Sequence, residues 1–297
     1  MKSPIPVPEI KVGACEHLRC YPAKAKDMGK IDLPKERVAD WKETMLRKMA
    51  EVLEKYRSVR LFMDICVKCG ACADKCQFFL GTGDPKNMPV ARADLLRKVY
   101  KRYFTLGGKI LGKANDAEEL SEEVLRDWLT YFYQCSECRR CSVFCPYGID
   151  TAEITMAARE IMAAAGIATK YVTEVVAKVY DLGNNLGIGP EAWKYNCAFL
   201  EEDVKDIEGI EIRFPVDEVG AEVLLVPPSA DNFANTNTMI GYAKMFHAAG
   251  ISWTTSTYCN EGGNFGLFLN YANLKKINNR ILEAARQLKV KKIYWGE

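Results

Sequence analysis

Apolar residues return every three or four positions along four stretches of the chain, which predicts amphipathic helices with one buried face. The first stretch runs from Pro34 to about Met63, where the proline suits a first helical turn and the apolar stripe indicates core packing. The other predicted helices span 91–104, 124–133 and 152–165. Glycine and proline separate these stretches, so we expect several distinct helices and not one long one.

The helix expected over 91–104 carries basic residues opposite its apolar face. We expect its outward side to present Arg92, Arg97, Lys98, Lys101 and Arg102. Such a row is typical of a solvated helix face. The alternative is a docking surface for an acidic partner or for lipid headgroups.

Near residue 220 the pattern changes to short apolar runs. These runs predict three strands, at 223–226, 251–257 and 292–295. Periodic stretches predict the two helices between them, at 238–247 and 273–288. The order strand–helix–strand–helix–strand predicts a parallel sheet with right-handed crossovers. A parallel sheet of three strands is small, so we expect that the chain is truncated at Glu297 or completed by another polypeptide.

The bulk properties exclude some classes of partner. The 297 residues carry 41 Lys and Arg against 39 Asp and Glu, so no strong basic field attracts nucleic acid. At 48% hydrophobic residues the chain can bury a core. No apolar run reaches the roughly 18 residues of a membrane span, and no signal peptide follows Met1. We therefore expect a cytoplasmic protein without a transmembrane segment of its own.

Eight of the twelve cysteines fall in two runs of identical spacing. The runs are Cys66-x2-Cys69-x2-Cys72-x3-Cys76 and Cys135-x2-Cys138-x2-Cys141-x3-Cys145-Pro146. This is the spacing of bacterial two-cluster ferredoxins, in which three cysteines wrap one [4Fe–4S] cubane and the fourth reaches to the other. We expect one cluster on Cys66, Cys69, Cys72 and Cys145 (the cluster-1 set). We expect a second on Cys135, Cys138, Cys141 and Cys76 (the cluster-2 set).

Other roles for the cysteines fit the chain less well. Disulfide frameworks belong to short secreted domains. Cys-x2-Cys pairs also bind zinc, but a tetrahedral zinc site has no use for a third cysteine at the same interval. Outside the runs, Cys15, His17 and Cys20 lie close in sequence without an evident fourth ligand, so free thiols are expected there. Cys197 is expected to be a buried thiol.

Together these patterns predict an α+β fold class, in which a mostly helical two-cluster ferredoxin domain precedes an incomplete parallel α/β domain. Prolines discourage regular helix near the N-terminus, so we expect an extended arm over 1–33. The ferredoxin domain is expected over 34–170, a connector over 171–219 and the α/β domain over 220–297.

Five segments carry a resemblance to a known family. They are Cys66-Val67-Lys68-Cys69-Gly70-Ala71-Cys72, Cys135-Ser136-Glu137-Cys138-Arg139-Arg140-Cys141, Glu191-Ala192-Trp193, Thr254-Thr255-Ser256-Thr257-Tyr258 and Asn264-Phe265-Gly266-Leu267-Phe268. The doubled run with its helical insert resembles the iron–sulfur domains of heterodisulfide reductase and succinate dehydrogenase. The α/β tail resembles the cysteine-rich CCG domains of heterodisulfide reductase. Over nearly its whole length the chain resembles the DsrK (HmeD) family of the membrane-bound DsrMKJOP complex.

The tail departs from the CCG pattern at its ligand positions. Pro228-Ser229 stands where the pattern expects a cysteine after the first strand, and Cys259-Asn260-Glu261 stands where it expects two cysteines and a glycine. This first copy is therefore expected to be degenerate and to bind no cofactor. The resemblance places a second copy, with the catalytic cluster, beyond residue 297. Catalytic residues within the chain are not identified.

The resemblance implies an electron-transfer subunit of an oxidoreductase in anaerobic, dissimilatory sulfur metabolism. Electrons would come from a haem b, quinol-oxidising membrane subunit (DsrM-like), which also holds the chain at the membrane. They would go to a disulfide on the small carrier protein DsrC. Alternatives are another heterodisulfide reductase, a quinone-linked dehydrogenase, a zinc-stabilised interaction module, or an enzyme that uses Cys259 and Glu261. The flanking charges Lys68, Lys75, Arg139 and Arg140 either raise the cluster potentials or are simply solvated.

Overall fold

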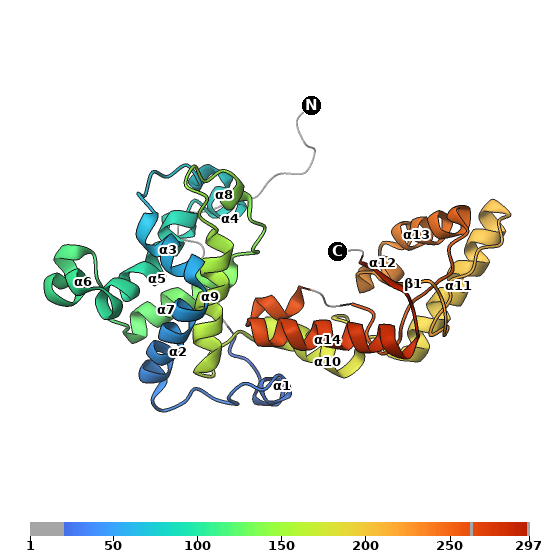
Figure 1. Cartoon of the computed structure of the whole chain (residues 1–297), viewed down its shortest axis with the longest axis horizontal. Coiled ribbons are helices and arrows are strands. Elements are labelled where there is room, and N and C mark those ends of the chain that lie inside the picture. The colour runs from blue at the N-terminus through green and yellow to red at the C-terminus, as the bar shows by residue number, and fades with distance from the viewer. Residues whose placement is uncertain (1–20, 262–263, 296–297) are drawn as a thin grey trace. The chain divides into compact units, whose positions relative to one another are not determined.

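The computed structural model describes residues 21–261 and 264–295, and these form two compact units (Figure 1). Within the described ranges, unit 1 comprises residues 21–25 and 33–170, and unit 2 comprises residues 26–32, 171–261 and 264–295. Cys15, His17 and Cys20 lie outside the described residues. No helix within the described ranges is both long and apolar enough to cross a bilayer.

The regular elements in the described part of unit 1 are helices and 3-10 turns. Its helices are α2 (Trp41–Lys55), α3 (Arg57–Ile65), α4 (Gln77–Thr82), α5 (Pro89–Phe104), α6 (Leu106–Leu111), α7 (Glu122–Gln134), α8 (Arg140–Val143) and α9 (Thr151–Ala164). Short 3-10 turns lie between them: η2 (Ala73–Lys75), η3 (Pro85–Asn87) and η4 (Gly112–Asn115). The helices predicted over 91–104, 124–133 and 152–165 are thus confirmed as α5, α7 and α9.

Helix α9 forms the centre of unit 1 and packs against α2, α3, α5 and α7 (Figure 1). Nearly all of its side chains are buried, as expected for a helix that is apolar around most of its circumference. Asp150 caps its first turn by accepting hydrogen bonds from the backbone N–H groups of Ala152 (2.9 Å) and Glu153 (3.3 Å). The cap fixes where α9 begins, directly after the second cysteine run.

The helix predicted from Pro34 to Met63 is wrong in two respects. Residues 35–40 form turns and bends, and α2 begins only at Trp41. The helix is also interrupted at Tyr56, whose backbone leaves the helical region with φ −108° and ψ 82°. The break starts α3 in a new direction, and α3 ends one residue before Cys66. The predicted apolar stripe is correct, since Met45 and Met49 are fully buried.

The prediction that Arg92 and Arg97 point outward from α5 is also wrong. Their exposed fractions are 1% and 2%. Arg92 donates a hydrogen bond to the carbonyl oxygen of Tyr131, and Arg97 donates one to that of Met63, each at 2.9 Å. Buried guanidinium groups are tolerated because these carbonyls replace their hydration. The basic face of α5 is consequently smaller than the sequence pattern indicates.

Unit 2 combines a small parallel sheet with helices. Its elements are α1 (Ala25–Lys30), α10 (Lys170–Leu182), α11 (Pro190–Glu208), β1 (Val223–Val226), α12 (Ser229–Phe233), α13 (Thr236–Ala249), β2 (Trp253–Thr254), η5 (Phe265–Phe268), α14 (Tyr271–Gln287) and β3 (Lys292–Trp295). The sheet order is β2-β1-β3, and both pairings are parallel. The predicted parallel sheet is confirmed, although β2 is shorter than the predicted strand. Segment 171–219 contains α10 and α11.

Strand β1 lies at the centre of three layers. Val223 and Leu225 pack into a cluster with residues of α11 and α13, whereas Leu224 and Val226 pack into another with residues of α14. Alternate residues of a strand point to opposite faces, so helices must cover both sides of the sheet. This arrangement places the loops after β1 and β2 at one edge, where Ser229 and Cys259 lie.

Candidate metal centre

The two cysteine runs adopt the same local backbone conformation. In the first run, Lys68 and Gly70 have φ angles of 56° and 79°. In the second run, Glu137 and Arg139, at the same offsets from the first cysteine, have φ angles of 57° and 59°. Left-handed geometry is costly for residues other than glycine. Its repetition at matching positions indicates that each loop is held in a curved form that turns its cysteines to one side.

The fold brings cysteines from both runs together. One cavity of unit 1 is lined by the four cysteines of the cluster-1 set, together with Arg97 and Thr151. Thus Cys145 from the second run lies beside the first triplet. Near the other triplet, the side-chain amide of Gln77 donates to the hydroxyl oxygen of Ser136 at 3.1 Å, and η2 packs on α8. This contact brings the residue after Cys76 next to the residue after Cys135.

A helix N-terminus lies beside the third cysteine of each run. Burial raises the pKa of the Cys72 thiol to about 11, and a hydrogen bond from the backbone N–H of Val90, in the first turn of α5, opposes this rise. Burial likewise raises the pKa of Cys141, opposed by a hydrogen bond from Thr151 in the first turn of α9. In both cases burial favours the neutral thiol, and the hydrogen bond from the start of the neighbouring helix favours the thiolate.

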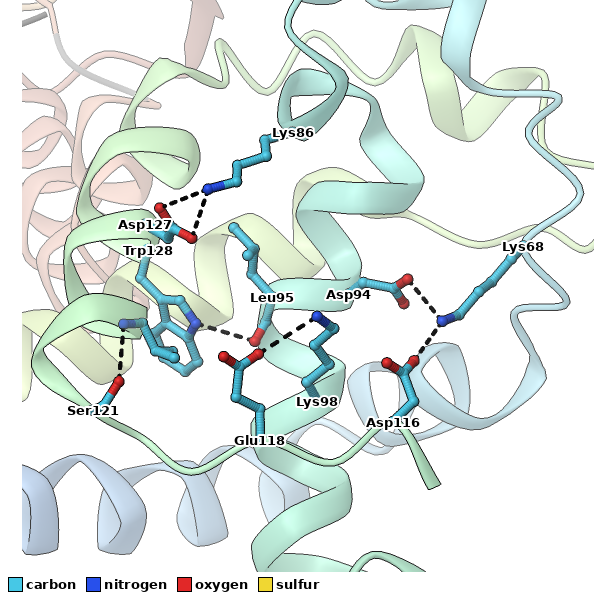
Figure 2. Close-up of polar contacts among 11 residues, drawn as sticks. Lys68, Lys86, Asp94, Leu95, Lys98, Asp116, Glu118, Ser121, Asp127 and Trp128 are labelled. Carbon is cyan, nitrogen blue, oxygen red and sulfur yellow. Dashed lines mark hydrogen bonds and ion pairs between the residues drawn. The ribbon is translucent and has the colours of Figure 1, made fainter. Parts of the chain in front are cut away.

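Most of the charged residues inside the runs are ion-paired. The Lys68 ammonium contacts Asp94 at 2.9 Å and Asp116 at 2.6 Å, as Figure 2 shows. Arg139 contacts Asp150 at 3.2 Å. These carboxylates compensate the two cations. Lys68 and Arg139 are therefore ion-paired and not simply solvated.

A buried arginine forms hydrogen bonds and an ion pair with the second run. Arg159 of α9 donates two hydrogen bonds to the Phe132 carbonyl oxygen, at 3.2 and 2.8 Å, and one to that of Cys135. Its Nη1 also contacts Glu137 at 2.7 Å. Burial raises the pKa of Glu137 to about 7, while Arg159 and Arg139 oppose the rise. The sequence pattern did not identify Arg159 as part of the site, because it lies within an apolar helix.

The residues around the cavity fit an iron–sulfur cluster. A cubane takes one thiolate from each of four cysteines, so its ligands surround a cavity. Arg97 lines this cavity, and its Nη2 atom is buried without a hydrogen-bond acceptor among the described residues. A cluster sulfur would supply that acceptor.

The sheet edge of unit 2 has a different chemistry. The Glu261 carboxylate is buried and accepts hydrogen bonds from the backbone N–H groups of Ser229 and Asn185, both at 2.7 Å, and from the Ser229 hydroxyl at 2.8 Å. Cys259 is fully buried beside it, and burial raises the pKa of its thiol to about 11. Ser229 and Glu261 thus bond to each other where the CCG pattern expects a cysteine after the first strand and a glycine after the second.

Gly183 explains why the loop after β2 can close so tightly. Its φ is 77°, and a Cβ atom there would lie 2.6 Å from the carbonyl oxygen of Tyr258. The Gly183 carbonyl accepts hydrogen bonds from the backbone N–H groups of Asn260 and Glu261, each at 3.1 Å. Only glycine permits this close approach. The sequence shows a glycine at this position, but it does not show that the glycine packs against the loop after β2.

Comparison with known proteins agrees with this chemistry. Residues 62–149, which contain both runs, match the family model of the 4Fe-4S dicluster domain. The chain is 45% identical over 278 residues to "Hdr-like menaquinol oxidoreductase iron-sulfur subunit 2" of Archaeoglobus fulgidus, covering 92% of this chain and 49% of that protein. It is 45% identical over 264 residues to the "Hdr-like menaquinol oxidoreductase iron-sulfur subunit" of Archaeoglobus profundus, covering 87% and 47%.

A more distant relative belongs to the dihydromethanophenazine:CoB–CoM heterodisulfide reductase of Methanosarcina barkeri. It is 28% identical over 105 residues, which are 35% of this chain and 25% of that protein. No solved structure gives a significant match. The chain spans about half the length of the Archaeoglobus relatives. These similarities support the resemblance to heterodisulfide-reductase-like subunits. The more specific resemblance to the DsrK family stays a prediction. The chain has Hdr-like iron–sulfur subunits as homologues over most of its length.

Proposed function

We propose that the chain is an electron-transfer subunit that holds two [4Fe–4S] clusters, one on the cluster-1 set and one on the cluster-2 set. The observation that carries this proposal is the cavity that Cys145 shares with Cys66, Cys69 and Cys72. The hydrogen bonds from Val90 of α5 to Cys72 and from Thr151 of α9 to Cys141 support it, since each favours the thiolate form. When bound, the clusters supply one-electron transfer, and the chain positions and insulates them.

The names of the relatives extend this proposal to a complex. We propose that the chain belongs to an Hdr-like menaquinol oxidoreductase, as its Archaeoglobus relatives do by name. A haem b membrane subunit would then supply the electrons and hold the chain at the membrane. The acceptor would be a disulfide, in the finer form of the proposal one on a carrier of the DsrC type within a DsrMKJOP-like complex. The reductase centre for that disulfide is proposed to lie outside these residues.

The sheet edge of unit 2 supports the proposal that the reductase centre lies outside these residues. Ser229 and Glu261 bind each other and the surrounding backbone, so neither presents a free ligand. Cys259 is fully buried in an apolar cluster with residues of α14. A thiol enclosed by apolar side chains is inert, because neither a substrate nor a cluster can reach it. Unit 2 is therefore proposed to have a structural role at this edge.

Iron analysis of variants purified without oxygen tests the proposal. The wild-type chain should contain about eight irons and give a paramagnetic signal after reduction with dithionite, since each cubane holds about four. The variant Cys145→Ala should lose about four irons or more. The matched control Cys259→Ala, which removes a buried thiol outside both runs, should retain about eight. A wild-type chain with zinc in place of iron, or equal iron in both variants, would contradict the proposal.

A further inference from the structure

Each cysteine run is preceded by a helix whose C-terminal end is covered by a buried arginine. The carbonyl oxygens of Met63 and Phe132, each three residues before the first cysteine of its run, accept hydrogen bonds from Arg97 and Arg159 respectively. The last carbonyls of a helix have no partner within that helix, so another group must supply one. The two arginines, on α5 and α9, hold equivalent places in the two halves of unit 1.

The two arginines differ in how many of their guanidinium nitrogens have a hydrogen-bond or ion-pair partner. Every nitrogen of Arg159 has a partner: Nε and Nη2 bond to backbone carbonyls, and Nη1 contacts Glu137. The cations near both runs have carboxylate partners, with Lys68 and Arg97 beside Asp94 and Arg139 beside Asp150. Net charge alone therefore does not distinguish the surroundings of the two runs.

Arg97 has a donor left over. Its Nε bonds to Met63 and its Nη1 to Asp94, but Nη2 is buried and has no acceptor among the described residues. An unsatisfied buried N–H costs about 1–3 kcal/mol, and such groups are rare in native proteins. Arg97 also lines the cavity formed by the cluster-1 set. Arg97 therefore lines a cavity bordered by four cysteines and carries one donor without a partner among the described residues.

We infer that Arg97 Nη2 donates a hydrogen bond to a sulfur of the cluster held by Cys66, Cys69, Cys72 and Cys145, and so makes that cluster the easier of the two to reduce. This inference rests on the proposed function, because it requires both clusters. Hydrogen bonds to sulfur raise the reduction potential by stabilising the added negative charge. One electron enters the cluster, and no covalent bond forms or breaks. Arg97 thus tunes the potential of this cluster.

Redox titration followed by electron paramagnetic resonance tests the inference in the anaerobically purified chain. In Arg97→Met, iron should stay at about eight per chain, and the ratio of reduced to oxidised cluster at fixed potential should fall about tenfold for one cluster only, equal to 59 mV for a one-electron couple. The control Lys98→Met removes a cation from the same helix outside the cavity and should leave both potentials unchanged. Unchanged potentials in Arg97→Met would overturn the inference.

A second measurement remains decisive if Arg97→Met does not assemble its clusters. Wild-type protein labelled with 15N-arginine should show a nitrogen coupling to one reduced cluster in pulsed electron paramagnetic resonance. Arg97→Lys should lose this coupling. A wild-type chain with about eight irons and no arginine coupling would refute the inference alone. A wild-type chain without iron would instead refute the proposed function.

Discussion

The Glu261 network offers a quantitative test of how unit 2 is stabilised at its sheet edge. Its carboxylate accepts three hydrogen bonds, two from backbone N–H groups and one from the Ser229 hydroxyl, with Oε1 and Oε2 each bound to one backbone donor. In Glu261→Gln one oxygen becomes an NH2 group, which cannot accept. In either orientation of the amide, the N–H of Ser229 or of Asn185 therefore loses its acceptor.

The expected cost follows from these contacts. One buried N–H without an acceptor costs about 1–3 kcal/mol. The remaining hydrogen bonds also weaken, because a charged acceptor binds roughly twice as strongly as a neutral one. The lower desolvation cost of a neutral amide offsets part of this loss. We expect a net loss of about 2–3 kcal/mol in the free energy that holds β1 and α12 closed.

Hydrogen exchange followed by mass spectrometry measures this change in the intact chain. Peptides from 223–233 should exchange roughly 30- to 150-fold faster in Glu261→Gln, the factor that about 2–3 kcal/mol of local opening energy implies. The control Glu283→Gln makes the same chemical change at an exposed residue that accepts from the Tyr258 hydroxyl. It should leave these peptides within a few-fold of wild type. Equal exchange in Glu261→Gln and wild type would refute the reasoning.

Two further substitutions test the packing of unit 1 and the surface of unit 2. Gly166→Ala should destabilise unit 1 by about 2–4 kcal/mol, because φ is 74° and the new Cβ would lie 2.2 Å from the Glu36 carbonyl oxygen. This loss of stability should be measurable as faster hydrogen exchange in peptides from α9. Lys205→Ala should leave thermal unfolding unchanged, because its ion pair with Glu211 is solvent-exposed. A clear drop in its midpoint would show that this surface pair contributes to stability.

Much of the secondary structure could be predicted because its signals are local. The predicted helices at α5, α7, α9 and α14 follow from apolar residues at helical spacing. The parallel sheet follows from the alternation of strands and helices. These features need information only from neighbouring residues. The break at Tyr56 was missed because neither glycine nor proline marks it.

The candidate site divides in the same way. The sequence by itself determined the two cysteine runs and their chemistry, since the number and spacing of thiols are covalent properties of the chain. Only the tertiary structure decided that Arg97 and Arg159 lie buried at the runs, because their acceptors are carbonyls 34 and 27 residues away. A charged side chain is predicted from the sequence to be exposed. It can be buried only where the fold brings a hydrogen-bond partner to it, such as a distant backbone carbonyl. Burial of charge is therefore a property of the fold, whereas cysteine spacing is a property of the sequence.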